Sequence, residues 1–378
     1  MPASLAADWL VSAWDQNAGL ASPTPAVSAI EAVAGRWVLE LLDLPRHASF
    51  AFVTGCQMAH VTALAAARHG VFARHGIDLP EVGLHGAPPL RVIVGEKRHV
   101  TLTRALRLLG VGRAQEVVVP ADDQGRMRVE ALAEALAADG PTIVCAQAGE
   151  VNTGAFDDLA AVVDLAHAAN AWVHVDGAFG LWARATPLLS GLAEGAERAD
   201  SWATDAHKWL NVPYDCGIAL CAHPDAHTAA MEYAAPYLAV SDHAVERDPM
   251  GYSPEFSRRA RSLPVWAAIR SLGRHGVADL VERSCAHARA LAEGLAALDG
   301  VELLNEVVLN QVLVRFETDA RTDAIVRAVQ DEGEAWMSAT SWAGRRAIRI
   351  SVSCWRTDDD DVRRTLDAFR HAAAGHPA

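Results

Sequence analysis

Two stretches of the sequence decide the fold: Trp172-Val-His-Val-Asp-Gly-Ala-Phe179 and Thr204-Asp-Ala-His-Lys-Trp209. The first is a β-rich run that ends in the carboxylate Asp176, and the second carries Lys208 directly after a histidine. Around them, from about residue 50 to 220, short β-branched runs alternate with amphipathic runs of helix length. This alternation predicts βαβ units and therefore an α/β fold, with a mostly parallel central sheet covered by helices.

The expected elements place three features at one edge of that sheet. Asp176 closes one strand, Lys208 follows another, and Gly55 lies between a strand and a helix. Ligands of such sheets bind outside the carboxyl ends of the strands, so these three residues can converge on one crevice. The expected strands are Arg91–Val94, Glu116–Val119, Thr142–Ala146, Ala171–Val175, Ser201–Thr204 and Gly217–Cys221, and the expected helices include Met58–Ala73, Val100–Leu109, Val129–Ala138 and Asp158–Ala169.

The pattern changes after Pro264, which predicts a separate, smaller α+β domain. We therefore expect an N-terminal helical segment at 1–47, a large domain at 48–262 and a small domain at 263–378. Residues 222–262 form a long connection, and such connections are often functional lids. In the small domain we expect a helix to about Ala297, strands at Val301–Leu304, Gln311–Phe316 and Ala347–Val352, a helix near Thr322–Asp331 and a last helix from about Asp358.

Composition narrows the classes of function. The formal net charge of −14 argues against binding to nucleic acid or to an anionic membrane as the main role. We find no apolar run long enough to span a bilayer and no leader at the N-terminus, so we expect a cytoplasmic protein. The six cysteines are scattered without a Cys-x-x-Cys, which fits reduced thiols. His174 and Asp176 share a strand face, but no further ligand stands at a readable spacing, so we expect no metal.

A carboxylate at one strand end and a lysine in a later segment suit pyridoxal 5'-phosphate (PLP). The lysine forms a Schiff base with the cofactor, and the acid keeps a proton on the pyridine nitrogen, so that the ring is an electron sink. Lys208 would need a lowered pKa, which burial beside a positive or polar group provides. The alternatives are a lysine that only snorkels at a strand end and an Asp176 that only caps a following helix.

A phosphate site is expected at Val53-Thr-Gly-Cys-Gln-Met-Ala-His60, where a strand leads into an Ala-rich helix. The first N–H groups of a helix have no partner within it, and its dipole is positive there, which suits a phosphate dianion.

These segments resemble the cofactor core of the PLP-dependent group II amino-acid decarboxylases, the family of aromatic-amino-acid and glutamate decarboxylases. The resemblance implies the type I, aspartate-aminotransferase-like fold. Ala178 matches the position beneath the PLP ring, and His99, in Gly95-Glu-Lys-Arg-His99, matches a histidine that stacks on the ring. Gly55-Cys56-Gln57-Met58 stands where the family has a turn ending in small-Ser-Glu, so the contact of the serine hydroxyl is either lost or replaced by the Gln57 amide. The resemblance assigns catalysis to Lys208, His99 and Asp176, and cofactor binding to these three with Ala178, His207, Gly55, Cys56, Gln57 and Asp205.

On the substrate side, the resemblance is less specific. Arg349 matches an arginine that fixes the substrate α-carboxylate, although structural ion pairing is the alternative. Glu150 and Val151 occupy the places where the family has a cofactor-side threonine, so Glu150 either puts a carboxylate in the pocket or lies at the rim. With Asn17, it argues weakly against a purely aromatic pocket. Three tyrosines of the long connection are candidates for a mobile-loop proton donor: Tyr233, Tyr237 and Tyr252.

The resemblance implies decarboxylation of an L-amino acid to the amine and CO₂, in a homodimer with the active site at the interface. The alternatives are an aldehyde-forming oxidative decarboxylation, a carbon–carbon lyase, or a truncated chain that binds PLP without turnover. Family members carry a further N-terminal arm that wraps the dimer partner, and this chain begins just after it. We therefore expect exposed apolar surface near Trp9, Trp14 and Trp37.

Overall fold

The computed structural model describes residues 1–231 and 247–376. The N-terminal segment forms two helices, α1 (Pro2–Trp14) and α2 (Pro25–Leu41), and each begins with a proline in its first turn, where the missing N–H costs nothing. They pack beside the first half of the long helix α9 (Ser262–Ala296), where the rings of Trp37 and Trp266 stack with centroids 6.4 Å apart.

The large sheet has seven strands in the order β1-β7-β6-β5-β4-β2-β3. The run from β6 to β3 is parallel, and β7 is antiparallel to both of its neighbours. The expected mostly parallel sheet is thus confirmed. Residues of β1, β4, β5, β6 and β7 are buried throughout, as expected for strands covered on both faces. The strands are β1 (Ser49–Val53), β2 (Arg91–Gly95), β3 (Glu116–Val119), β4 (Thr142–Gln147), β5 (Trp172–Asp176), β6 (Ser201–Asp205) and β7 (Gly217–Cys221).

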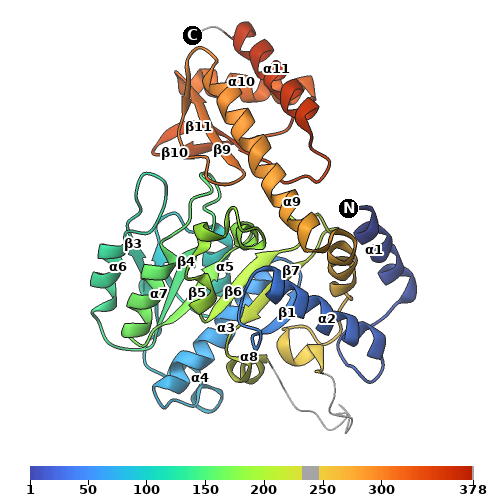
Figure 1. Cartoon of the computed structure of the whole chain (residues 1–378). Coiled ribbons are helices and arrows are strands. Elements are labelled where there is room, and N and C mark those ends of the chain that lie inside the picture. Colours follow the sequence, from blue (N-terminus) through green and yellow to red (C-terminus); the bar gives the residue numbers. More distant parts are fainter. Residues whose placement is uncertain (232–246, 377–378) are drawn as a thin grey trace.

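Helices cover the sheet in two layers, visible on either side of the strands in Figure 1. One layer holds α3 (Cys56–Arg74), α4 (Leu79–Gly86), α5 (Val100–Leu108) and α8 (Pro224–Met231), which bury one set of strand side chains. The other holds α6 (Val129–Leu136) and α7 (Leu159–Ala168) with α2 and α9. Short 3-10 helices lie at Arg113–Gln115, Gly180–Ala185, Ser190–Ala193, Ala196–Arg198 and Pro249–Tyr252.

A second, antiparallel sheet in the order β10-β11-β9-β8 follows α9 and has its own core. Figure 1 shows this part above the large sheet, joined to it by α9. The strand at Ser338–Trp342 (β10) was not expected, because its small polar residues give no apolar alternation and only Trp342 is buried. The other elements are β8 (Val301–Leu303), β9 (Gln311–Phe316), β11 (Arg345–Ser351), α10 (Asp319–Glu332) and α11 (Asp359–Gly375).

The long connection at 222–262 contains structure of its own, since α8 occupies its beginning. Two of the three candidate proton donors, Tyr233 and Tyr237, lie outside the described residues. Tyr252 is described. The Arg247 Cζ lies 3.9 Å from the centroid of its ring, and the ring packs edge-on against His227. None of the helices in residues 1–231 and 247–376 is both long and apolar enough to cross a membrane.

Candidate active site

The carboxyl ends of β5 and β6 and the turn from β1 into α3 meet at one cavity of about 240 Å³. Asp176 is the last residue of β5, Lys208 follows the end of β6, and Gly55 precedes α3. The structure therefore brings together the three features that the sequence placed at one edge. The lining residues are Gly55, Cys56, Gln57, His99, Thr101, Gln147, Gly149, Val151, Asp176, Ala178, Phe179, Asp205, His207 and Lys208.

Lys208 is half-buried, and its Nζ lies 3.1 Å from Oδ2 of Asp205. Burial favours the neutral amine, but Asp205, Cys56 and Asp176 favour the ammonium ion and together raise the pKa of Lys208 above its ordinary value. The expectation of a lowered pKa is therefore wrong for this arrangement, because two carboxylates outweigh the burial.

Asp176 is almost fully buried, with 4% of its surface exposed. Its Oδ1 accepts the N–H of Ala178 at 3.2 Å, and its Oδ2 lies 3.5 Å from Nε2 of His60. Burial opposes ionisation, but His60, with Lys208 and His99, lowers the pKa of Asp176 below its ordinary value. Asp176 is thus a carboxylate at neutral pH, as a partner for a protonated ring nitrogen must be.

The turn before α3 is built on two glycines. Gly55 has φ +125°, a conformation that residues with a side chain rarely adopt. A Cβ on Gly217 of β7 would lie 2.2 Å from the carbonyl carbon of Gly55, so the two backbones touch. Asp205 Oδ1 accepts the Cys56 N–H at 2.7 Å. In the described part of the chain, the next two N–H groups, of Gln57 and Met58, meet no acceptor and are available to a phosphate.

Two cavity histidines are held by backbone N–H groups. His99 precedes α5, and its Nδ1 accepts the Thr101 N–H at 3.4 Å and lies 2.7 Å from the Thr101 hydroxyl. His207 Nδ1 accepts the Cys216 N–H at 3.1 Å, and its ring stacks on Tyr214 with centroids 4.1 Å apart. Burial is the main cause that lowers the pKa of both imidazoles, so both are neutral near pH 7.

The cavity wall does not include the three residues expected on the substrate side. Glu150 is buried in its own loop, where its carboxylate accepts the N–H groups of Asn152 and Thr153 at 2.7 and 2.8 Å. Its neighbours Gly149 and Val151 line the cavity instead. Asn17 Oδ1 accepts the backbone N–H groups of Gly19 and Arg258.

Arg349, on β11, comes nearer to the cavity. Its guanidinium reaches the carbonyl of Val151 and the hydroxyl of Ser338, both at the long distance of 3.5 Å. Val151 itself lines the cavity, so Arg349 stands directly behind the wall. Whether it binds substrate stays a prediction.

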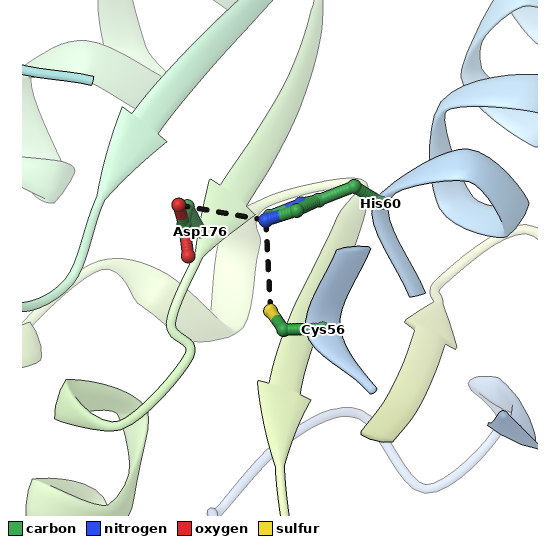
Figure 2. Close-up of side chains that lie close together, drawn as sticks. All are labelled: Cys56, His60 and Asp176. Atoms are coloured by element: carbon green, nitrogen blue, oxygen red, sulfur yellow. Dashed lines mark hydrogen bonds and ion pairs between the residues drawn. The ribbon is translucent and has the colours of Figure 1, made fainter. Parts of the chain in front are cut away.

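Sequence reasoning missed Thr101, Gln147 and Phe179 in the cavity wall, and it missed His60 behind Asp176. Figure 2 shows His60 between Asp176 and Cys56, with Nε2 3.5 Å from the nearest atom of each. The ligand atoms of these three residues lie within 4.8 Å of one another, a spacing that could hold a metal ion. The available signal was the i, i+4 spacing of Cys56 and His60, which sets both on one face of α3.

Comparisons with known proteins identify the family. The model of the pyridoxal-dependent decarboxylase conserved domain matches residues 1–317. The chain belongs to this family. L-2,4-diaminobutyrate decarboxylase of Rhizobium meliloti is 30% identical over 98% of this chain and 75% of its own length. Aromatic-L-amino-acid decarboxylase of Bacillus atrophaeus is 28% identical over 93% of this chain and 73% of its own length.

Solved structures agree with the decarboxylase fold. Oryza sativa TDC with PLP and tryptamine superposes with a TM-score of 0.92 at 25% identity, covering 99% of this chain and 81% of that one. Mouse CSAD superposes with a TM-score of 0.90 at 22% identity, covering 98% of this chain and 81% of that one, and shows the fold alone. This chain is thus a PLP-dependent amino-acid decarboxylase of the type I fold.

The cavity of the decarboxylase fits this cofactor. It combines one lysine amine, one buried ionised carboxylate and one helix N-terminus with two available N–H groups. Those are the groups that an aldehyde, a protonated ring nitrogen and a phosphate require.

Proposed function

We propose that this decarboxylase converts an L-amino acid to the amine and CO₂ with Lys208, Asp176 and His99 as its catalytic residues. One observation carries the assignment: the only cavity lysine and a buried, ionised Asp176 open on the same 240 Å³ space as the N-terminus of α3. PLP, when bound, supplies an electron sink for the pair of electrons left by CO₂.

Each residue has a role that its surroundings support. Lys208 would hold the cofactor through its amine, and Asp205 stabilises the ammonium form of the free side chain. Asp176 keeps a proton on the ring nitrogen. The N–H groups of Gln57 and Met58, beside Gly55, Cys56 and His207, hold the phosphate.

Ala178 and His99 both line the cavity and would hold the ring of the cofactor between them. The neutral imidazole of His99 accepts the Thr101 N–H through Nδ1, so its Nε2 carries the hydrogen and can donate to a substrate carboxylate. Behind Val151, Arg349 draws the α-carboxylate to that side of the cavity. Excluding water and orienting the substrate carboxylate in this cavity would favour loss of CO₂.

The chain offers a clean test because it contains two lysines, Lys97 and Lys208. Lys97 pairs with Glu96 at 2.9 Å and does not line the cavity, so Lys97→Ala is a matched control. Loaded with PLP, the wild type and Lys97→Ala should show a visible absorption band that borohydride fixes to the peptide containing Lys208. Lys208→Ala should show neither.

Activity is then measured as CO₂ release across the amino acids, with the organic product identified. Equal amounts of amine and CO₂ support the proposal. An aldehyde product, a cleaved side chain, or a band without turnover would replace it with the corresponding alternative. A cofactor attached to Lys97 would refute the assignment of Lys208.

The proposal extends to a homodimer in the cytoplasm. Apolar side chains of α1 are exposed, among them Leu5, Trp9, Leu10 and Trp14, and an exposed apolar helix face favours association. All six cysteines are free, which favours a reducing compartment. Sedimentation equilibrium should give twice the 40.3 kDa chain mass, and Trp9→Ser should weaken the association. A monomer at working concentration would contradict the homodimer.

A further inference from the structure

A chain of buried polar groups runs through the layer between α3 and the sheet and ends at Asp176. Trp172, His174 and Asp176 alternate along β5, so they share the face that α3 covers. Ser201 stands opposite His174 on β6, and His60 reaches down from α3. His60, His174 and Ser201 have no exposed surface. Buried polar groups in such a layer are costly unless each has a partner.

Four contacts connect these buried polar groups, from Trp172 to Asp176. The Trp172 indole Nε1 donates to Ser201 Oγ at 2.9 Å, and Ser201 Oγ lies 3.0 Å from His174 Nδ1. His174 Nε2 lies 2.9 Å from His60 Nδ1, with the two rings edge to face. His60 Nε2 then faces Asp176 Oδ2 at 3.5 Å, as drawn in Figure 2.

The Trp172 indole fixes the donor-to-acceptor direction of these hydrogen bonds, because an indole N–H can only donate. Ser201 accepts from it and has one hydrogen left to give, and His174 Nδ1 is there to accept it. His174 then carries its proton on Nε2 and donates to His60 Nδ1. His60 in turn carries its proton on Nε2, and that N–H points at Asp176. Every group is satisfied and both imidazoles are neutral.

The opposite direction leaves unsatisfied groups. If Ser201 accepted from both Trp172 and His174, its own hydrogen would meet no other side-chain acceptor among the described residues. His60 Nε2 would then present a lone pair to the Asp176 carboxylate, and the only donor beside it among the described residues would be the weak Cys56 S–H at 3.5 Å. Burial, helped by the neighbouring His60, lowers the pKa of His174 to about 3, which agrees with a neutral ring.

We propose that Ser201, His174 and His60 form a directed hydrogen-bond relay that fixes the His60 Nε2–H toward Asp176 and so keeps this carboxylate oriented and ionised. His60 and His174 are positioning residues, since neither lines the cavity. The proposal rests on the role proposed for Asp176 and adds the reason why this buried carboxylate stays charged.

The tautomers can be observed without the cofactor. Protein labelled with ¹⁵N at histidine and prepared without PLP should show His60 and His174 as neutral Nε2–H tautomers at pH 7, assigned with His60→Gln and His174→Gln. Ser201→Ala should release the direction and give His174 in both tautomers. A single Nδ1–H tautomer for either ring in the wild type would overturn the relay.

The effect on Asp176 is measured as PLP affinity. His60→Leu fills similar space without an N–H and should weaken PLP binding about 10-fold to 100-fold, since a buried charged acceptor loses its donor. His60→Gln can present an amide N–H to Asp176 and should restore most of that loss. Equal affinity in wild type and His60→Leu would overturn the relay, and so would a His60→Gln as weak as His60→Leu.

A matched pair elsewhere in the fold controls for lost stability. Ser49 and His227 form an equally buried contact at 2.8 Å that leads to the Tyr252 carbonyl and not to Asp176. Ser49→Ala should lower stability as Ser201→Ala does, and yet leave PLP affinity unchanged. If the wild type failed to attach PLP at Lys208, the proposed function would fall, while the tautomer measurement would still test the relay.

Discussion

At the residue scale, the two oxygens of the Asp205 carboxylate contact two different donors. One oxygen accepts the Cys56 N–H at the start of α3, and the other faces the Lys208 amine at 3.1 Å. This carboxylate therefore connects the turn before α3 to the loop that holds Lys208, and it stabilises the ammonium ion. Attachment of an aldehyde to Lys208, as proposed, needs the neutral amine, so the Asp205 carboxylate should raise the pH at which it occurs.

Asp205→Asn should move the pH dependence of PLP attachment to lower pH. The Asp205 carboxylate raises the Lys208 pKa, and an amide keeps the oxygen that accepts from Cys56 but loses the charge. The Lys208 pKa falls, and the neutral amine is present at lower pH. The growth of the visible band after mixing with PLP, followed across pH, gives the midpoint. Asp215→Asn, which removes a carboxylate bound to Arg261, is the control; a midpoint that stays or rises contradicts the prediction.

Sequence could place Lys208, Asp176 and Gly55 together because the carboxyl ends of neighbouring strands meet at one edge. It could not give the sign of the Lys208 pKa shift, which depends on the direction in which the Asp205 side chain points. Nor could it show that Glu150 turns into its own loop, because that follows from the N–H groups of Asn152 and Thr153. Local pattern fixes positions along the chain, whereas side-chain partners follow from packing.

At the scale of elements, the site depends on how closely β7 passes the turn before α3. Gly217 pairs with Val53 of β1, and a Cβ on it would penetrate the Gly55 backbone. The sequence predicted β7 as a strand, but its antiparallel direction was not predicted, since a periodic pattern carries no direction. The β10 strand was not predicted because only one of its five residues is buried, so no apolar alternation marks it.

Gly217→Ala should destabilise the protein by about 1–3 kcal/mol, as overpacking does. It should weaken PLP binding as well, because the turn before α3 must move to make room for the new Cβ. Gly191→Ala is the matched control, since a Cβ there meets nothing within 4 Å. Urea unfolding and PLP titration provide the two measurements. A Gly217→Ala protein that binds PLP as tightly as the wild type would show that the turn and β7 are not coupled.

A second element-scale contact lies at the other end of β6. Buried Asp200 accepts from Arg74 at 2.9 Å and from the Val173 N–H at 2.7 Å, and it meets His167 and His223. Burial opposes ionisation, but the two histidines, the N–H and Arg74 lower the pKa of Asp200 below its usual 3.8. α3, α7, β5 and the start of α8 are joined through this one carboxylate.

Asp200→Asn should lower the free energy of unfolding at pH 7 by about 1.5–3 kcal/mol, the range for hydrogen bonds to a charged group. Because the folded pKa is depressed, this contribution is fully present above the unfolded pKa of 3.8 and declines as pH falls toward the folded pKa. Urea midpoints of wild type and variant should therefore converge only below about pH 4. If the two urea midpoints converged between pH 7 and 5, titration of the histidines, and not of Asp200, would account for the pH dependence.

At the scale of the whole molecule, one residue links the loop that holds Lys208 to the second sheet. Asn211, three positions after Lys208, donates through Nδ2 to the Ser353 carbonyl at 2.8 Å and accepts the Trp355 N–H through Oδ1. Its own carbonyl accepts from the Met1 amine at 3.2 Å. The loop that holds Lys208 is thus fastened to the segment leaving β11 and to the N-terminus. The sequence predicted both units but no such junction, which joins residues more than a hundred positions apart.

Two replacements of Asn211 distinguish what its backbone conformation and its side-chain hydrogen bonds each contribute to stability. Asn211 has φ +50°, which costs a residue with a Cβ about 1–2 kcal/mol and glycine nothing. Asn211→Gly removes only the side-chain bonds, which are the two across the junction and one to the Trp209 carbonyl at 2.8 Å. Asn211→Ala adds the backbone strain, so the second variant should be less stable by about 1 kcal/mol. In both, amide hydrogen exchange should rise at residues 206–212 and 353–355 together, because one contact restrains both segments. Faster exchange in only one of the two segments would mean that they are held independently, and that the second sheet does not steady the lysine.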